Sequence, residues 1–216
     1  SKAQMGDIYY MVDHIQFHKE VFQNRNKIRI KNEPGWQWLT VPIKNARKIQ
    51  LWHDVKIDNS KPWKRKHLNA IKMSYSKTPY FTEIFPEIEQ LYTDFEGDKL
   101  IDFIKIIVKY AFKKFDITTP IRYTSEIEGI DGKKSDLIIS MCKSCNAKTF
   151  IFGEVGKTYI DWEKFKDIKP VFQEFTHPKY TQTHGDFVSN MSFIDLLFNH
   201  GDDSKKILTK SKYNNE

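Results

Sequence analysis

Hydrophobic and polar positions alternate over short stretches in the first quarter of the chain. This pattern predicts strands at residues 7–13, 27–30, 37–43 and 49–57, with Gly35 in the turn between the second and the third. The first stretch, DIYYMVD, is an apolar run with an aspartate at its end, which is typical of a buried strand that ends at a site. The N-terminal part is therefore predicted to be rich in β structure.

The period becomes helical from Pro62 onward. A helix is predicted from Pro62 to about Pro79, because Leu68, Ile71 and Tyr75 share one face. Further helices are predicted at residues 80–94, 98–113, 134–145, 161–166 and 192–198, and further strands at 121–125, 149–152 and 170–175.

Alternating strands and helices are typical of an α/β fold. We expect a single three-layer domain with a mainly parallel sheet and crossover helices, because parallel strands need such connections. The length of 216 residues suits one domain, predicted at residues 1–204 and followed by a frayed C-terminal tail at 205–216. Ligands of such sheets bind beyond the carboxyl ends of the strands.

Charge is unevenly distributed along the chain, which has a net charge of +7. Thirteen Lys or Arg and three acids lie from Lys27 to Lys77, whereas Thr78 to Ile104 holds seven acids and one Lys. The basic part suits an anionic ligand such as a nucleotide or a nucleic acid, although a lysine-biased genome would give the same excess.

Two further features set the expected compartment. No run approaches the ~20 apolar residues of a membrane span, and no signal peptide opens the chain. The sequence has two cysteines, Cys142 and Cys145, too few for a disulfide scaffold. A soluble protein of a reducing cytoplasm is expected.

Three segments carry long ordered motifs: residues 16–28 (QFHKEVFQNRNKI), 36–44 (WQWLTVPIK) and 180–201 (YTQTHGDFVSNMSFIDLLFNHG). With these motifs the chain resembles the WbqC-like family from about Asp7 to Gly201. Genes of that family often lie among those for bacterial surface polysaccharides. The family usually begins with an additional strand and a His-x-Pro-Asn-like segment that this chain lacks, so we expect a longer parent or a natural fragment with an incomplete pocket.

Three residues are candidates for catalysis. His177 follows the last predicted strand and could accept a proton from an attacking amine or hydroxyl. His67 matches a family position and could be a general base or a phosphate contact, or only part of a solvated helix turn. Asp13 ends the first strand and could orient an amine, or it could cap a turn. His14 departs from the two consecutive acids of the family, which argues against a metal at Asp13.

Several polar and aromatic residues are candidates for substrate binding in the basic part. Gln16 could hold a polar ligand, and Arg25, beside Asn24, could hold a phosphate or carboxylate or instead form a salt bridge. Arg29 is expected to be solvated. One face of the third predicted strand would carry Trp36, Trp38, Thr40, Pro42 and Lys44, a wall suited to sugar rings or bases, unless the indoles are core packing.

The C-terminal half adds a glycine loop and the last motif. Gly153, Gly156 and Tyr159 resemble the family's glycine loop, where a backbone could approach a ligand closely, but the spacing is not that of a Walker loop. Tyr180, Gln182 and Asn190 complete the substrate-binding candidates. Ser192 and Asp195 have the spacing of a capping box.

No cofactor and no metal site are expected. Cys142 and Cys145 form a CxxC, but zinc needs four ligands, so buried helix cysteines are the favoured interpretation. No nucleophile motif such as GxSxG occurs, so an enzyme would act by direct transfer.

The resemblance implies a function. We expect a transferase of O-antigen or surface-glycan precursor synthesis, acylating or aminoacylating a nucleotide-linked amino sugar, with that sugar and an acyl donor as partners. The alternative is a non-enzymatic protein that binds nucleotide sugars or nucleic acid.

Overall fold

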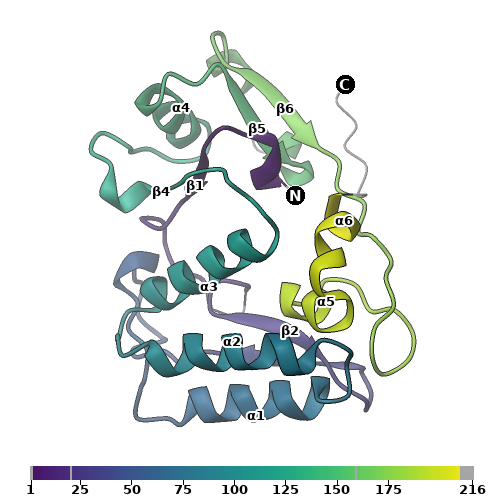
Figure 1. The fold of residues 1–216 in the computed structure, drawn as a ribbon. Coiled ribbons are helices and arrows are strands. Elements are labelled where there is room, and N and C mark those ends of the chain that lie inside the picture. Colours follow the sequence, from purple (N-terminus) through teal and green to yellow (C-terminus); the bar gives the residue numbers. More distant parts are fainter. Residues whose placement is uncertain (1, 20, 159, 210–216) are drawn as a thin grey trace. The chain divides into compact units, whose positions relative to one another are not determined.

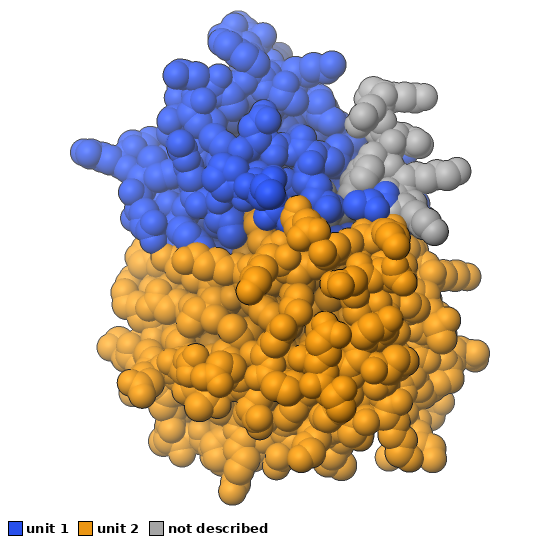
Figure 2. All heavy atoms as spheres, viewed as in Figure 1, with its two compact units in different colours: residues 1–14, 117–176, 208–216 blue, residues 15–116, 177–207 orange. Residues whose placement is uncertain are grey.

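The computed structural model describes residues 2–19, 21–158 and 160–209 (Figure 1). The chain divides into two compact units, coloured separately in Figure 2. Unit 1 comprises Ser1–His14, Ile117–Thr176 and Leu208–Glu216, and unit 2 comprises Ile15–Asp116 and His177–Ile207. Each unit is thus built from segments that are far apart in the sequence.

Unit 1 contains two parallel strand pairs and one α-helix among its described residues. Strand β1 (Tyr9–Met11) pairs with β4 (Ile121–Tyr123), and β5 (Thr149–Gly153) pairs with β6 (Lys169–Gln173). Helix α4 (Ser135–Ser144) packs on β5. The core of this unit is formed by Ile130, Leu137, Ile138, Met141, Cys142, Phe152, Phe165 and Ile168. Short 3-10 helices lie at Lys2–Met5, Thr124–Glu126, Glu154–Thr158 and Trp162–Lys164.

Unit 2 combines an antiparallel hairpin with helices. Strands β2 (Arg25–Arg29) and β3 (Trp36–Thr40) form the hairpin. Helices α1 (Trp63–Tyr75), α2 (Phe81–Asp94), α3 (Leu100–Lys114) and α5 (Phe193–His200) complete it, with α1 and α2 side by side in Figure 1. Short 3-10 helices lie at Trp52–Asp54 and Gly201–Asp203, and α6 spans Ser204–Thr209.

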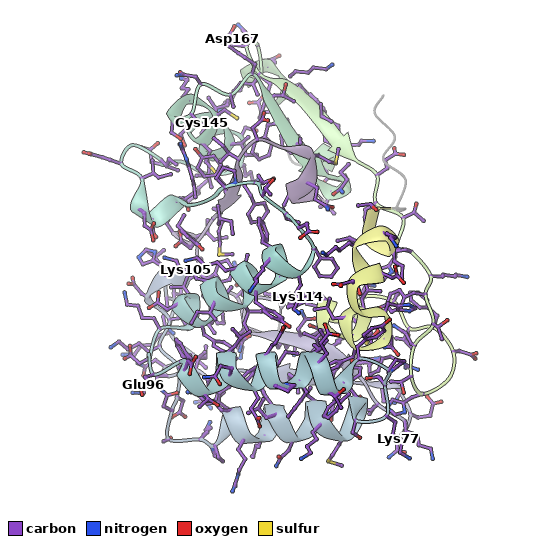
Figure 3. The ribbon with its side chains drawn as sticks, viewed as in Figure 1. Lys77, Glu96, Lys105, Lys114, Cys145 and Asp167 are labelled. Carbon is purple, nitrogen blue, oxygen red and sulfur yellow. The ribbon has the colours of Figure 1, made fainter. Side chains whose placement is uncertain are left out.

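Aromatic packing and one ion pair join the helices of unit 2. The ring of Trp63 on α1 lies 5.0 Å from that of Phe103 on α3 and 5.7 Å from that of Tyr92 on α2. Lys114, labelled in Figure 3, pairs with Glu87 of α2 at 2.6 Å between Nζ and Oε2. Helices α1, α2 and α3 therefore pack against one another through aromatic rings and an ion pair.

Most predicted elements are found, with one clear exception. The strand predicted at residues 49–57 is wrong, because Trp52–Asp54 is a 3-10 helix and Leu51 and Ile57 form only isolated bridges. The α/β class is confirmed in coarse form, as small sheets of which two are parallel pairs. A single three-layer domain is not confirmed.

The predicted tail overlaps a helix. Residues 205–209, assigned to a frayed tail, lie in α6, whereas 210–216 lie outside the described residues. The domain boundary at residue 204 stays a prediction. No helix of the described residues is long and apolar enough to cross a membrane.

Gly156 should contribute to stability, whereas Gly153 should not. A Cβ at Gly156 would lie 2.8 Å from the Cβ of buried Phe152, but a Cβ at Gly153 would meet nothing within 4 Å. We expect Gly156→Ala to cost about 1–3 kcal/mol, which lowers Tm by about 2–4 °C per kcal/mol. Gly153→Ala should change stability by no more than about 0.5 kcal/mol. Thermal unfolding followed by circular dichroism checks this, and equal Tm values would contradict it.

Candidate functional site

Strands β2 and β3 put cations and indoles on one face. The register pairs Arg25 with Thr40, Lys27 with Trp38, and Arg29 with Trp36. Directly paired residues of an antiparallel ladder project to the same side of the sheet. We name Arg25, Lys27, Trp36, Trp38 and Thr40 the basic–aromatic face.

The cations of this face lie over the indole rings. Arg25 Cζ is 4.0 Å from the Trp38 ring centroid, and Lys27 Nζ is 3.9 Å from that of Trp36 and 5.1 Å from that of Trp38. These distances are within the ~6 Å of cation–π contacts. Lys27 has no acidic partner among the described residues. Its positive charge is therefore available to an anion.

Arg29, at the end of β2, is buried instead of solvated. It is 2% exposed, and its guanidinium donates to the backbone carbonyls of Gly35, His184 at 2.7 Å and Asp186 at 3.1 Å. The expectation of a solvated Arg29 is wrong, because a segment about 155 residues further along the chain folds over the strand and supplies two of these carbonyls. A buried cation requires such acceptors.

Asp195 of α5 is the centre of a buried network. Its Oδ1 accepts a hydrogen bond from Tyr75 Oη at 3.0 Å, and its Oδ2 accepts from Tyr180 Oη and Gln182 Nε2, both at 2.8 Å. Tyr75 Oη in turn accepts from Arg29 N at 3.0 Å. Burial raises the pKa of the Asp195 carboxyl, and these hydrogen bonds and Arg29 oppose that rise.

The predicted capping box is wrong. Ser192 is the N-cap of α5, but its side chain makes no cap hydrogen bond. Asp195 is fully buried and uses its carboxylate within the network. The spacing of Ser192 and Asp195 suits a capping box. The Asp195 carboxylate instead accepts hydrogen bonds from Tyr75, Tyr180 and Gln182.

His177 and Asn190 lie together in a segment that is attached to β2. Asn190 N donates to His177 Nε2 at 3.4 Å, and His177 Nδ1 lies 3.1 Å from Pro178 O. Ser192 N donates to Lys27 O at 2.8 Å. The half-buried His177 ring therefore contacts a residue that is two positions from the attachment to β2.

Gln182 has a structural part in the same segment. Its Oε1 accepts from Val188 N at 2.8 Å and its Nε2 donates to Val188 O at 3.0 Å. Together with the bond to Asp195, these contacts close the loop from residue 182 to residue 188. The amide is buried and holds the chain, and Tyr180 is held in the same way by Asp195.

His67 is a buried link between elements. Its Nε2 lies 3.0 Å from Thr40 O and its Nδ1 3.2 Å from Tyr92 Oη. Because a carbonyl only accepts, Nε2 carries the proton and Nδ1 accepts from the tyrosine. Burial lowers the pKa of His67 to about 4. Both nitrogens are used, so the geometry favours a structural role over the predicted catalytic one.

Asn24 lies under the hairpin with one atom unused. Its Nδ2 donates to Val41 O at 3.0 Å, while the buried Oδ1 has no hydrogen-bond partner among the described residues. A ligand N–H or O–H would satisfy that oxygen. Gln16 and Lys44 are exposed, and Lys44 lies beyond the end of β3, away from the wall expected to include it.

The remaining candidates belong to unit 1. Asp13 accepts from Thr124 Oγ1 at 3.1 Å, Ser125 N at 2.8 Å and Ser125 Oγ at 2.7 Å. The carboxylate thereby joins the ends of β1 and β4. Gly153 ends β5 and Gly156 packs under Phe152. Tyr159 lies outside the described residues.

Sequence reasoning missed two residues of the site. Lys27 alternates in phase with Arg25, which was a usable signal. Tyr75 had been counted only as a member of an apolar helix face, and no pattern identified its bonds to Arg29 and Asp195.

Unit 1 contains a cavity of about 670 Å³. The N-terminal segment, β1, β5 and the C-terminal end of α4 line it, including Cys142 and Cys145 (labelled in Figure 3). None of the predicted site residues lines this cavity. Cys142 is buried in the apolar face of α4, as expected. In the part of the chain that the structure describes, no group of three or more His, Cys, Asp or Glu could hold a metal ion.

Comparison with known proteins gives one family and one relative. A family model described as the WbqC-like protein family matches residues 1–207. The uncharacterized protein Rv1507c of Mycobacterium tuberculosis is 27% identical over 199 residues, which cover 90% of this chain and 84% of that protein. No solved structure matches the chain.

The buried His67 should make stability depend on pH. Because its folded pKa of about 4 lies below the usual 6.5, the unfolded chain protonates first as pH falls. We expect unfolding free energy to fall by about 3 kcal/mol between pH 6.5 and 4 relative to His67→Gln, at about 1.36 kcal/mol per pKa unit. Urea unfolding at a series of pH values checks this, and parallel profiles for the two proteins would contradict it.

Asp195 should make stability depend on pH in the opposite direction. A raised carboxyl pKa means that the folded protein binds the proton more tightly, so its stability contribution is complete below the unfolded pKa and is lost as pH rises through the folded pKa. We expect Asp195→Asn to be about 1–3 kcal/mol less stable at neutral pH. This deficit should grow as pH falls toward 4. The same urea series measures it, and a shrinking deficit would show that the pKa is not raised.

Proposed function

Because this chain belongs to the WbqC-like protein family, we propose that it binds a nucleotide-linked sugar on the basic–aromatic face during surface-glycan precursor synthesis. The observation that carries the proposal is the seating of Arg25 and Lys27 over the indoles of Trp38 and Trp36. An anion and a ring could be held there by neighbouring groups of one hairpin.

The chemistry of the face matches the two parts of such a ligand. Indole faces pack against sugar rings or bases, and charged donors bind phosphate oxygens with strong hydrogen bonds. Thr40 is exposed beside Arg25 and adds a hydroxyl for a polar substituent.

A transferase is the second candidate, supported by the position of His177. With Nδ1 protonated toward Pro178 O, Nε2 carries a lone pair, and Asn190 N lies 3.4 Å from it. In acyl or aminoacyl transfer to an amino sugar, the amine would form the new C–N bond and lose a proton to this nitrogen. His177 is thus the catalytic residue of this candidate, without His67 or Asp13.

Tryptophan fluorescence provides the test. A UDP-linked amino sugar should change the emission saturably. Lys27→Met and Trp38→Leu should each weaken binding about tenfold or more, because a charge-assisted hydrogen bond contributes about 1.5–3 kcal/mol. Lys72→Met on α1 and Trp162→Leu in unit 1 are matched controls and should bind like the unchanged protein.

Three results separate the alternatives. Saturable binding with acyl transfer that His177→Ala abolishes supports the transferase, and binding without transfer supports a non-enzymatic binding protein. Stronger and steeply salt-dependent binding of an oligonucleotide supports the nucleic-acid alternative. Equal affinities of Lys27→Met and Lys72→Met would contradict the assignment of the basic–aromatic face.

A further inference from the structure

Loops of unit 2 expose apolar side chains that the core does not use. We name Ile49 and Leu51 the Ile49 patch. Ile49 is 84% exposed and Leu51 is 44% exposed. Single exposed apolar residues are normal on a protein surface, but a group of them marks a contact surface.

Backbone hydrogen bonds hold the segment that carries the patch against a second loop. Phe17 N donates to Gln50 O at 2.9 Å, and Trp52 N donates to Ile15 O at 2.8 Å. Gln16 pairs with Leu51 between these bonds. The side chains of Gln16 and Leu51 therefore lie on one side of this short ladder, and those of Ile15 and the buried Phe17 lie on the other.

The loop that carries Ile49 is held in shape by its own hydrogen bonds. Lys48 N donates to Asn45 O at 2.8 Å, and Gln50 Nε2 donates to Asn45 O at 3.2 Å. Ile49 lies between these residues and points to solvent as part of an ordered turn. A surface that is ordered before binding loses less conformational entropy on contact.

Positive charge accompanies the exposed apolar side chains. Lys44, Arg47 and Lys48 are exposed, and the sequence from Gly35 to Trp52 contains these three cations and no acid. Asp54, just beyond this segment, lies 3.4 Å from His53. A partner that binds this patch should therefore carry negative charge and have an apolar region that accepts aliphatic side chains.

We propose that the Ile49 patch docks this protein on the surface of an anionic lipid bilayer. Aliphatic and aromatic side chains enter the boundary of headgroups and acyl chains, and Lys or Arg residues bind anionic headgroups. Nucleic acid fits less well, because Ile and Leu have no aromatic face on which a base could stack.

Vesicle sedimentation tests the proposal. The full chain should bind vesicles of phosphatidylcholine and phosphatidylglycerol in roughly two-to-one proportion, and bind phosphatidylcholine alone far more weakly. Ile49→Asp should weaken binding about tenfold or more. Lys44→Gln, Arg47→Gln and Lys48→Gln together should weaken it on the order of a hundredfold, at about fivefold for each charge. Met73→Asp on α1 is the matched control, because Met73 is 83% exposed outside the patch.

Each other outcome overturns the proposal. No vesicle binding, equal binding to both vesicle types, or equal losses for Ile49→Asp and Met73→Asp would do so. If the chain bound no vesicles, and if the patch variants lost oligonucleotide binding, the surface would be assigned to nucleic acid. If Ile49→Asp has a lower Tm than the unchanged protein, Ile49→Ser is used in its place. The result is independent of the proposed function, because nucleotide-sugar binding is measured without lipid.

Discussion

The burial of the Arg29 guanidinium is the constraint on which much of unit 2 depends. A buried cation needs acceptors, and here backbone carbonyls of the hairpin turn and of the segment at residues 184–186 supply them. Asp195 compensates the charge at longer range, and Tyr75 connects the two through its hydroxyl. Strand β2, helix α1 and helix α5 are thereby held by one connected set of polar groups. Removing any member leaves another buried group without a partner.

This arrangement gives the long motif at the end of the chain a physical meaning. Several of its polar residues, among them Gln182 and Asp195, are buried and hold the segment on β2. His177 and Asn190 remain at the edge of that support, next to the strand that carries Lys27. A rigid support beneath exposed polar groups is what a binding site requires. The motif therefore combines support with a smaller number of residues able to meet a ligand.

The sequence predicted the parts of the fold that depend on local patterns. The helical period located α1, α2 and α3 well, because each buries one apolar face. The stretch at residues 49–57 alternates like a strand, but its backbone is used by a 3-10 turn and isolated bridges. The indole wall was predictable because alternation places Trp36 and Trp38 on one face. The burial of Arg29 and the bond from Tyr75 to Asp195 were not, since His184 and Asp186 lie about 155 residues from Arg29 and Tyr75 lies 120 residues from Asp195. The two contacts of His67 were not predictable, because nothing in the neighbouring sequence shows that a backbone carbonyl and a tyrosine hydroxyl bind its ring nitrogens.

The division of both units between distant segments also determines the order in which the molecule can form. Strand β1 is made early in synthesis, but its partner β4 follows more than 100 residues later, after the first part of unit 2. Of its three carbonyl acceptors, the Arg29 guanidinium has only that of Gly35 until residues 184–186 have been synthesised. Neither unit can complete its native contacts on the nascent chain until synthesis is well advanced. Until then water satisfies the remaining Arg29 donors, and the burial of this side chain is therefore a late step in the formation of unit 2.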